Sequence, residues 1–222
     1  MAMALHEDLY FCLTDRGAIF LDLSANRYFG LSGATDRAFR RIVAGDALDP
    51  ALEQELKPLM SSGLLHRAED IRSMAPPAIE PPIMSFSAGG SGAVASTTLS
   101  ALSRHAAVRL EMRVRGLKAM MARRRARKSA ALAHGPIGSR VDAADPVLAA
   151  HRAVDRLLGG ANRCLARSLS LIDHLAQRGA YPNLVIGVRA GAFSAHCWVQ
   201  QGSTVLNDEL DRVRLFTPIL VL

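Results

Sequence analysis

Three side chains in the last third of this 222-residue chain have the types and the order of a nucleophile, a general base and an orienting acid. Cys164 provides a thiol, His196 an imidazole and Asp208 a carboxylate. A cysteine thiolate attacks carbonyl carbons, a histidine exchanges protons near neutral pH, and a carboxylate orients the histidine and stabilises its charged form. This set predicts covalent catalysis at a carbonyl group.

The surroundings of Cys164 predict that it lies in the first turn of a helix. Asn162 is a suitable N-cap, and the apolar-rich sequence from Arg163 to about Arg178 has the pattern of a buried helix. Unpaired N–H groups and the positive end of the helix dipole favour a thiolate there, and the same N–H groups can bind an oxyanion. A lone cysteine is more often a small buried hydrophobe, so the assignment depends on its two partners.

His196 and Asp208 are expected on neighbouring strands. Residues 193–199 and 204–206 have the pattern of strands joined by a Gln-Gly turn, and antiparallel pairing brings the residues after the second strand toward His196. The alternation of side chains places Cys197 on the opposite face from His196. Two neighbours compete with Asp208 as the orienting group: Asn207 and Asp211.

The rest of the chain predicts an α+β protein. Three short strands within residues 9–31 form a meander, and helices that begin after Ser32 and at Pro50 follow it in a winged-helix-like arrangement. The C-terminal part packs the helix of the nucleophile against an antiparallel sheet. Residues 99–134 predict one long helix or two, with a shared apolar face formed by Leu110, Val114, Leu117 and Met121.

The distribution of proline, glycine and charge divides the chain. Proline pairs and a Gly-Gly-Ser-Gly run predict a linker at 76–98, between domains at 1–75 and 99–222. The net charge of +7 comes from residues 100–140, which carry +10. Their basic run at 123–128 is expected to be a solvated helix end. Nucleic acid is disfavoured as a partner because the winged-helix-like part is itself acidic.

The number of cysteines and the hydropathy pattern argue against a disulfide-bonded, zinc-binding, secreted or membrane-spanning protein. Three cysteines at irregular spacing argue against a disulfide framework and against a CxxC zinc site, and no metal or organic cofactor is expected. Charged residues arrive by Glu7, which leaves no room for a signal peptide, and no stretch has the composition of a membrane span. A cytoplasmic protein without stable membrane insertion is therefore expected.

Four segments together resemble the transglutaminase-like leader peptidases of lasso-peptide biosynthesis, the B proteins of that pathway. That family carries a C-L-x-R-S-L-x-L element, a G-V element, an F-x-A-H-x-W-V element and an Asn-Asp pair. The matching segments here are 162–169, 184–189, 193–199 and 206–208. The resemblance implies a transglutaminase/papain-like domain with a Cys164-His196-Asp208 triad. Cys197 stands where the family usually has alanine, and Gln200 where it commonly has glutamate.

The N-terminal meander and its helices resemble the PqqD-like leader-recognition element. In that family a leader peptide adds a strand to the edge of the meander and packs against a helix. Backbone hydrogen bonds then provide affinity, and pockets for the peptide's side chains provide specificity. Because side chains alternate across a strand, two consecutive residues cannot both face one pocket. The resemblance makes five residues candidates for leader binding: Arg27, Tyr28, Phe29, Leu52 and Leu56.

The two resemblances together imply a cysteine peptidase that binds a ribosomal precursor peptide and removes its leader. They also imply a partner, an asparagine-synthetase-like cyclase that uses ATP. Two other functions fit the residues alone: acyl transfer to an amine, as in transglutaminases or arylamine acetyltransferases, and peptide binding without catalysis. The N-terminal module favours a peptide over a small arylamine, and the complete triad argues against a decayed site.

Overall fold

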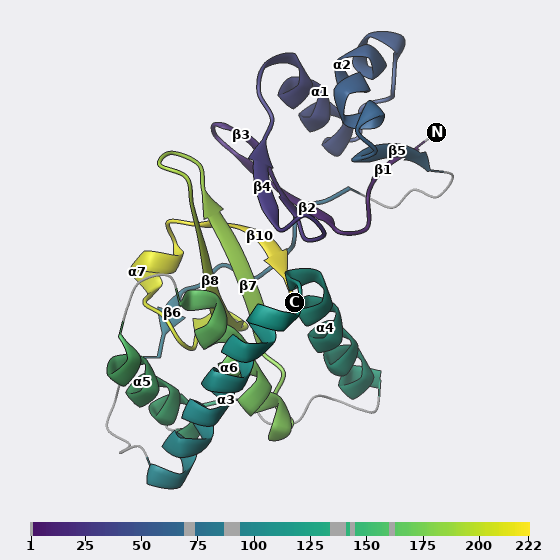
Figure 1. The fold of residues 1–222 in the computed structure, drawn as a ribbon. Helices are drawn as coiled ribbons and strands as arrows, with labels where there is room; N and C mark the ends of the chain where they lie inside the picture. The colour runs from purple at the N-terminus through teal and green to yellow at the C-terminus, as the bar shows by residue number, and fades with distance from the viewer. Residues whose placement is uncertain (1, 69–73, 87–93, 134–140, 143–144, 160–162) are drawn as a thin grey trace.

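A computed structural model describes residues 2–68, 74–86, 94–133, 141–142, 145–159 and 163–222 (Figure 1). The protein is a mixed α/β structure, as the sequence predicts. In Figure 1 a small sheet with two helices occupies the top, and a larger sheet with several helices lies below it.

The N-terminal region has the predicted meander. Its strands are β2 (Leu9–Thr14), β3 (Gly17–Asp22) and β4 (Arg27–Gly30), paired in that order and antiparallel. Helices α1 (Gly33–Val43) and α2 (Pro50–Ser61) cover one face, where the ring of Phe39 lies 5.0 Å from those of Phe11 and Phe20. A separate two-stranded sheet pairs β1 (Ala2–Leu5) antiparallel with β5 (Leu65–Ala68).

The other face of the meander packs against the C-terminal region. Cys12, Ile19 and Leu21 belong to the same buried cluster as Leu169 and Val188 of the lower part. An ion pair of 2.6 Å between Lys118 and Asp8 adds to this contact. Both faces of the meander are therefore buried, and the two regions share one hydrophobic core.

In the described part of the chain the C-terminal sheet has five strands, and its central strand carries one of the candidate residues. Strand β8 (Ser194–Gln201) carries His196 and pairs antiparallel with β7 (Asn183–Arg189). The outer strands are β10 (Thr217–Val221) beside β7, β9 (Thr204–Val205) beside β8, and β6 (Met84–Ser85), which pairs parallel with β9. Strand β6 comes from the segment expected to be a linker.

Helix α6 (Cys164–Gln177) packs on this sheet and is nearly all buried. Leu169, Ile172 and Leu175 share the main core with Ile186 and Val199 of the sheet. Burial of so many apolar side chains fixes the position of the helix, and hence of its first residue. Helix α5 (Pro146–Leu158) lies beside α6, and the short α7 (Leu210–Val213) follows the last catalytic candidate.

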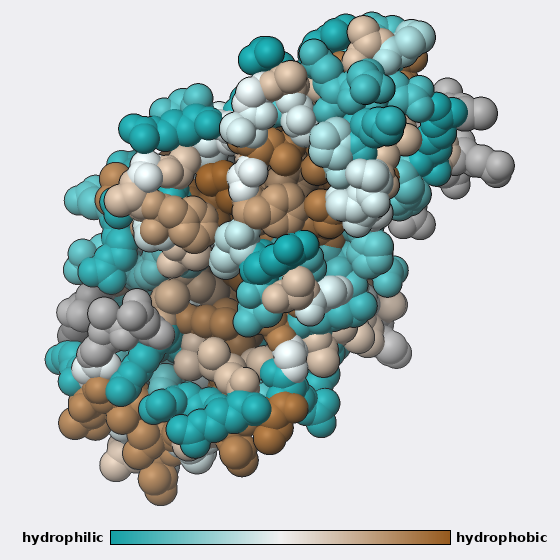
Figure 2. All heavy atoms as spheres, turned by 45° about the horizontal axis from the view of Figure 1, so that its top comes forward, coloured by the Kyte–Doolittle hydropathy of each residue, from teal (hydrophilic) through white to brown (hydrophobic). Residues whose placement is uncertain are grey.

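The expected apolar face of residues 99–134 is confirmed only in its second half: Leu117 and Met121 pack into the main core, whereas Leu110 and Val114 do not. The segment is two helices, α3 (Ala95–Val114) and α4 (Leu117–Ala133), and Leu110 and Val114 are 61% and 73% exposed. The buried side of α3 is formed by Ala101, His105 and Val108, because Ala101 lets α3 approach α5 closely. In Figure 2 apolar side chains are visible at the lower end of the molecule, where α3 and α5 lie.

The basic run at 123–128 is more than a solvated helix end. Arg124 is buried, and its guanidinium binds both Asp173 (2.5 Å) and Glu111 (2.8 Å). Arg127 binds Asp173 at 2.7 Å, and Lys128 donates to the carbonyl of Leu222 at 3.1 Å. These side chains hold α4 against α3, α6 and the end of the sheet. Within the described ranges no helix is long and apolar enough to cross a membrane.

Candidate active site

Cys164 is the first residue of α6, as the sequence predicts. Arg163 occupies the N-cap position without a capping side-chain bond, and Asn162 lies outside the described residues. The thiol is partly buried and accepts hydrogen bonds from the backbone N–H groups of Leu165 and Cys197. A sulfur atom at a helix start with two N–H donors is held in an environment that favours the thiolate.

His196 lies between the thiol and the carboxylate. Its Nε2 is 2.7 Å from Oδ2 of Asp208, and its side chain also hydrogen-bonds Cys164. Among the described strands, β9 pairs with β8 only at Gln200 and Gln201, so the edge of β8 beside His196 is open to the start of α6. The structure thus brings the three predicted residues into one hydrogen-bonded row.

Aromatic packing fixes the imidazole ring. Phe216 and Trp198 stack near it, at ring-centroid distances of 5.1 and 6.3 Å. Gly187 lies opposite His196 on β7, and a Cβ atom there would come within 2.9 Å of both Trp198 and Phe216. The glycine of the G-V element is therefore needed because the Trp198 ring and the Cβ atom of Phe216 occupy the space of its missing side chain.

A buried polar network behind the triad was not predicted. Asn207 accepts a hydrogen bond from the Val199 N–H at 2.7 Å and donates to Ser168 Oγ at 2.9 Å. Ser168 in turn donates to the Cys197 carbonyl at 3.2 Å. These bonds tie α6, β8 and the segment before Asp208 together. Asn207 is thus engaged with the backbone.

The structure also distinguishes Asp208 from its competitor Asp211 and shows the environment of Gln200. Asp211, the second competitor, is exposed on α7, whereas the Asp208 side chain is 5% exposed and also accepts from the Glu209 N–H at 2.8 Å. Gln200 is fully buried, accepts from Trp198 Nε1 at 3.0 Å, and donates to the carbonyls of Glu80 and Gly202. An amide supplies both the acceptor and the donors that this position requires, which a carboxylate could not do.

The triad residues shift one another's pKa values. For each of the three residues, burial is the largest single effect on the pKa, and it disfavours the charged form. The hydrogen bonds and charges around each residue together outweigh burial, so the net pKa shift favours the charged form in all three. They raise the pKa of His196 to about 9 and lower the pKa of Cys164 and of Asp208 below their usual values. The arrangement therefore favours a thiolate-imidazolium pair next to an ionised carboxylate.

We expect Cys164 to be the reactive thiol of the protein. Burial raises the pKa of Cys12 to about 12 and raises that of Cys197 as well, so both stay protonated and covered. Iodoacetamide at pH 7 should modify Cys164 at least about tenfold faster than either, because only a thiolate reacts. Peptide mapping of the alkylated protein over time measures this. Equal labelling of Cys12 and Cys164 in the folded protein would contradict the assignment.

Two of the five candidate leader-binding residues, Tyr28 and Phe29, line a groove, and Arg27 lies on the same strand outside its lining. Arg27, Tyr28 and Phe29 lie on β4, the last strand of the meander. Tyr28 and Phe29 pack toward different core clusters, as strand alternation requires, but both line a hollow of about 340 Å³, contrary to the expectation that consecutive residues cannot share a pocket. Phe193 also lines this hollow, and its ring is 5.4 Å from that of Tyr28. Phe193 immediately precedes β8, so the groove ends next to the strand that carries His196.

Leu52 and Leu56 do not line this groove. They are 1% and 0% exposed and belong to the core between α2 and the meander. A peptide cannot touch them without displacing that core, so their contribution is to the stability of the N-terminal region. The apolar spacing on α2 identified a buried face and not a binding face.

The comparison with known families gives a match over the C-terminal region. Residues 105–221, more than half of the chain, match the transglutaminase-like superfamily. The chain therefore belongs to this superfamily, and the matched segment contains Cys164, His196 and Asp208. Membership supports a cysteine-dependent activity of the peptidase or acyltransferase type. Comparisons with curated proteins and with solved structures gave no match.

Proposed function

We propose that this protein is a cysteine peptidase that binds the leader of a ribosomal precursor peptide and removes it during lasso-peptide maturation. Residues 1–75 would recognise the leader and residues 99–222 would cut it. The observation that carries the proposal is the row Cys164, His196 and Asp208 at the start of a buried helix. The motif resemblance supplies the substrate class.

The geometry supports a two-step reaction. The Cys164 thiolate attacks the scissile carbonyl, and backbone N–H groups at the helix start receive the negative charge on its oxygen. The His196 imidazolium then protonates the leaving amine, so the C–N bond breaks and a thioester remains. Neutral His196 next takes a proton from water, the resulting hydroxide attacks the thioester, and the thiol is regenerated with the leader released as an acid.

The outer edge of β4 is the proposed leader-binding strand. Leu31 N–H donates to the Ala18 carbonyl, so in an antiparallel ladder the adjacent Gly30 directs its N–H and carbonyl away from β3. No described strand pairs with that edge. A leader that pairs there would run along the groove between Tyr28 and Phe193, toward the start of β8 and the triad.

A proline at Gly30 is expected to weaken leader binding about tenfold or more. Proline removes the outward N–H and places a ring at the edge, which costs a backbone hydrogen bond and prevents strand pairing. Gly30→Ala is the matched control, since a Cβ there meets only the Ala18 carbonyl at 3.7 Å and the N–H is retained. Fluorescence anisotropy with a labelled leader measures both. Equal affinities of the two variants would exclude this edge as the binding site.

Mass spectrometry of the precursor peptide encoded beside this protein tests the function itself. Incubation with the protein should release a leader with a hydrolysed C-terminus, alone or in the presence of the ATP-using cyclase that we propose as partner. A leader joined to an added amine would instead indicate an acyltransferase. An intact precursor that is nevertheless bound would indicate a peptide-binding module.

A further inference from the structure

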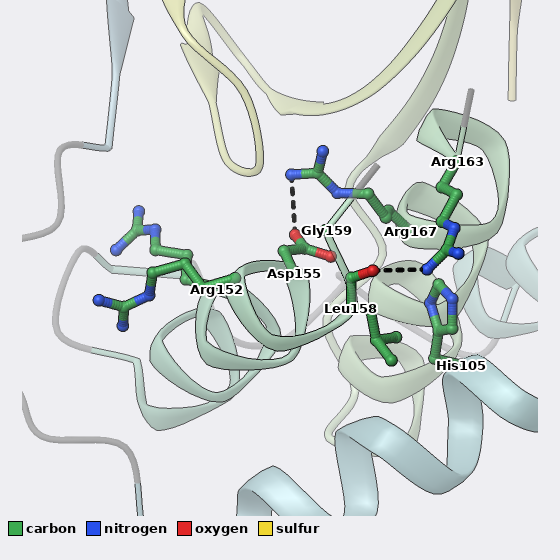
Figure 3. A pocket seen from close by; sticks show the side chains of 8 residues that line it. His105, Arg152, Asp155, Leu158, Gly159, Arg163 and Arg167 are labelled. Atoms are coloured by element: carbon green, nitrogen blue, oxygen red, sulfur yellow. Dashed lines mark hydrogen bonds and ion pairs between the residues drawn. The ribbon is translucent and has the colours of Figure 1, made fainter. Parts of the chain in front are cut away.

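A hollow of about 380 Å³ lies beside the first turn of α6 and is lined by four arginines (Figure 3). Arg152 and Arg156 come from α5, Arg163 immediately precedes Cys164, and Arg167 lies one turn after it. His105 of α3, Asp155, Leu158 and Gly159 also line it. We name this hollow the arginine pocket.

The charges of the arginine pocket are not balanced by its own residues. Asp155 is the one carboxylate among the described residues that line the pocket, and it binds Arg167 at 2.8 Å. Arg163 and Arg152 donate to the neutral carbonyls of Leu158 (2.8 Å) and Phe86 (2.7 Å). Carbonyl contacts orient the guanidinium groups but leave their charge in place, so an anion would relieve the mutual repulsion.

His105 adds an independent sign of a missing ligand. It is 3% exposed, and its Nε2 has no hydrogen-bond partner in the described part of the chain. In Figure 3 its ring lies directly below the Arg163 guanidinium. Burial, with the neighbouring Arg109, Arg163 and Arg167, lowers the pKa of His105 against the opposing effect of Asp155, which favours the neutral ring. A buried polar atom without a partner is rare in native proteins and calls for a ligand.

The pocket is close to the proposed nucleophile. Arg163 and Arg167 flank Cys164 on the same first turn of α6. The pKa of Asp155 is raised mainly by burial, and the Asp208 charge adds to this rise, which places Asp155 within electrostatic reach of the triad. A group bound in the pocket would therefore belong to the segment of a substrate near the reacting bond.

We propose that the arginine pocket is a specificity subsite for a carboxylate side chain, an Asp or Glu of the peptide near the bond that Cys164 attacks. Guanidinium groups bind carboxylates through paired, charge-assisted hydrogen bonds, and the neutral His105 can donate one more. The peptide as ligand rests on the proposed function, whereas anion binding beside Cys164 does not.

Two maleimides test the pocket without knowledge of the substrate. The carboxylate of 4-maleimidobutyric acid can reach beyond the thiol that it alkylates, and N-butylmaleimide is its neutral counterpart. Each rate at Cys164 is divided by the rate with N-acetylcysteine amide. We expect the charged reagent to be favoured about tenfold in the wild-type protein, and the preference to fall toward one in Arg156→Gln and Arg163→Gln.

The controls separate local recognition from general electrostatics and from misfolding. Arg113→Gln removes the same charge from the exposed side of α3, outside the pocket lining, and should keep the tenfold preference. The rate with the neutral reagent shows whether each variant retains a reactive Cys164. A ratio near one in the wild type, or an unchanged ratio in Arg163→Gln, would overturn the proposal.

Competing anions and peptides identify the ligand. At constant ionic strength, acetate should reduce the preference at least as well as inorganic phosphate; loss with phosphate alone would overturn the carboxylate assignment. A synthetic peptide library read by mass spectrometry should show Asp or Glu enriched at one position near the cut. Cleavage without that enrichment would refute the subsite and leave the peptidase intact. A charge preference in alkylation without any cleavage would refute the peptidase but not the anion site.

Discussion

Replacement of Cys164 by alanine is expected to abolish leader release while leader binding stays unchanged. The thiol is the one group in the proposed mechanism that forms a bond with the substrate, so cleavage should fall by about 10⁴-fold or more. Cys164 is not among the residues that line the leader groove on β4 and beside Phe193, so affinity should be retained. Mass spectrometry of the precursor and anisotropy of a labelled leader measure the two quantities.

Cys197→Ala is the matched control for this loss. Cys197 is a buried thiol on the face of β8 opposite to His196. Its backbone carbonyl accepts a hydrogen bond from Ser168, and the substitution leaves that carbonyl in place. The variant should cut at close to the wild-type rate, in keeping with the alanine that the resembling family carries there. Cleavage by a folded Cys164→Ala protein, or its loss in both variants, would contradict the assignment of the nucleophile.

The triad could be predicted because each member is positioned by a local pattern. A buried helix that begins near Cys164 presents its first residue to a sheet, and strand alternation separates His196 from Cys197. The turn at Gln201 and Gly202 then reverses the chain, so that β9 pairs with β8 and the segment with Asp208 returns toward His196. Local periodicity and turn chemistry are sufficient for such an arrangement, since the pairing of β7, β8 and β9 follows chain order.

Spacing alone did not predict which apolar side of a helix is buried. Leu110 and Val114 have the right period, yet the smaller Ala101 and Val108 form the packed side of α3. A close helix approach favours small residues, so the larger side chains are left outside. On α2 the apolar residues Leu52 and Leu56 are on the buried side, and the binding role that the resemblance implied for them does not fit their burial.

Long-range polar contacts could not be predicted at all. The bonds of Asn207 with Ser168, and of Arg124 with Asp173, join residues 39 and 49 positions apart. No local pattern identifies such partners, because they meet only when α6, the sheet and α4 are packed. The arginine pocket could not be predicted for the same reason, since His105 lies on α3 and Arg163 at the start of α6, and they meet only in the folded protein.

Asp208→Asn is expected to reduce cleavage by about 10²–10⁴-fold and to narrow the pH range of the reactive thiol. Asp208 contributes to the His196 pKa of about 9, so loss of its charge lowers that pKa. Imidazolium is then lost at a lower pH, and the alkaline limb of activity moves down from about pH 9. Cys164 also loses part of its cationic partner, so its thiolate forms at a higher pH and the acid limb moves up.

The pH dependence separates this electrostatic role from a structural one. A carboxamide keeps the size of Asp208 and can still accept from the Glu209 N–H, so the fold should be retained. Asp211→Asn makes the same charge change on the exposed surface of α7 and should leave both limbs in place. The cleavage rate followed from pH 5 to 10 gives both limbs, and alkylation of Cys164 over the same range gives the acid limb on its own, because alkylation requires only the thiolate. If the alkaline limb of Asp208→Asn stayed near pH 9, the high pKa of His196 would have to come from Cys164 alone, and Asp208 would not be its orienting partner.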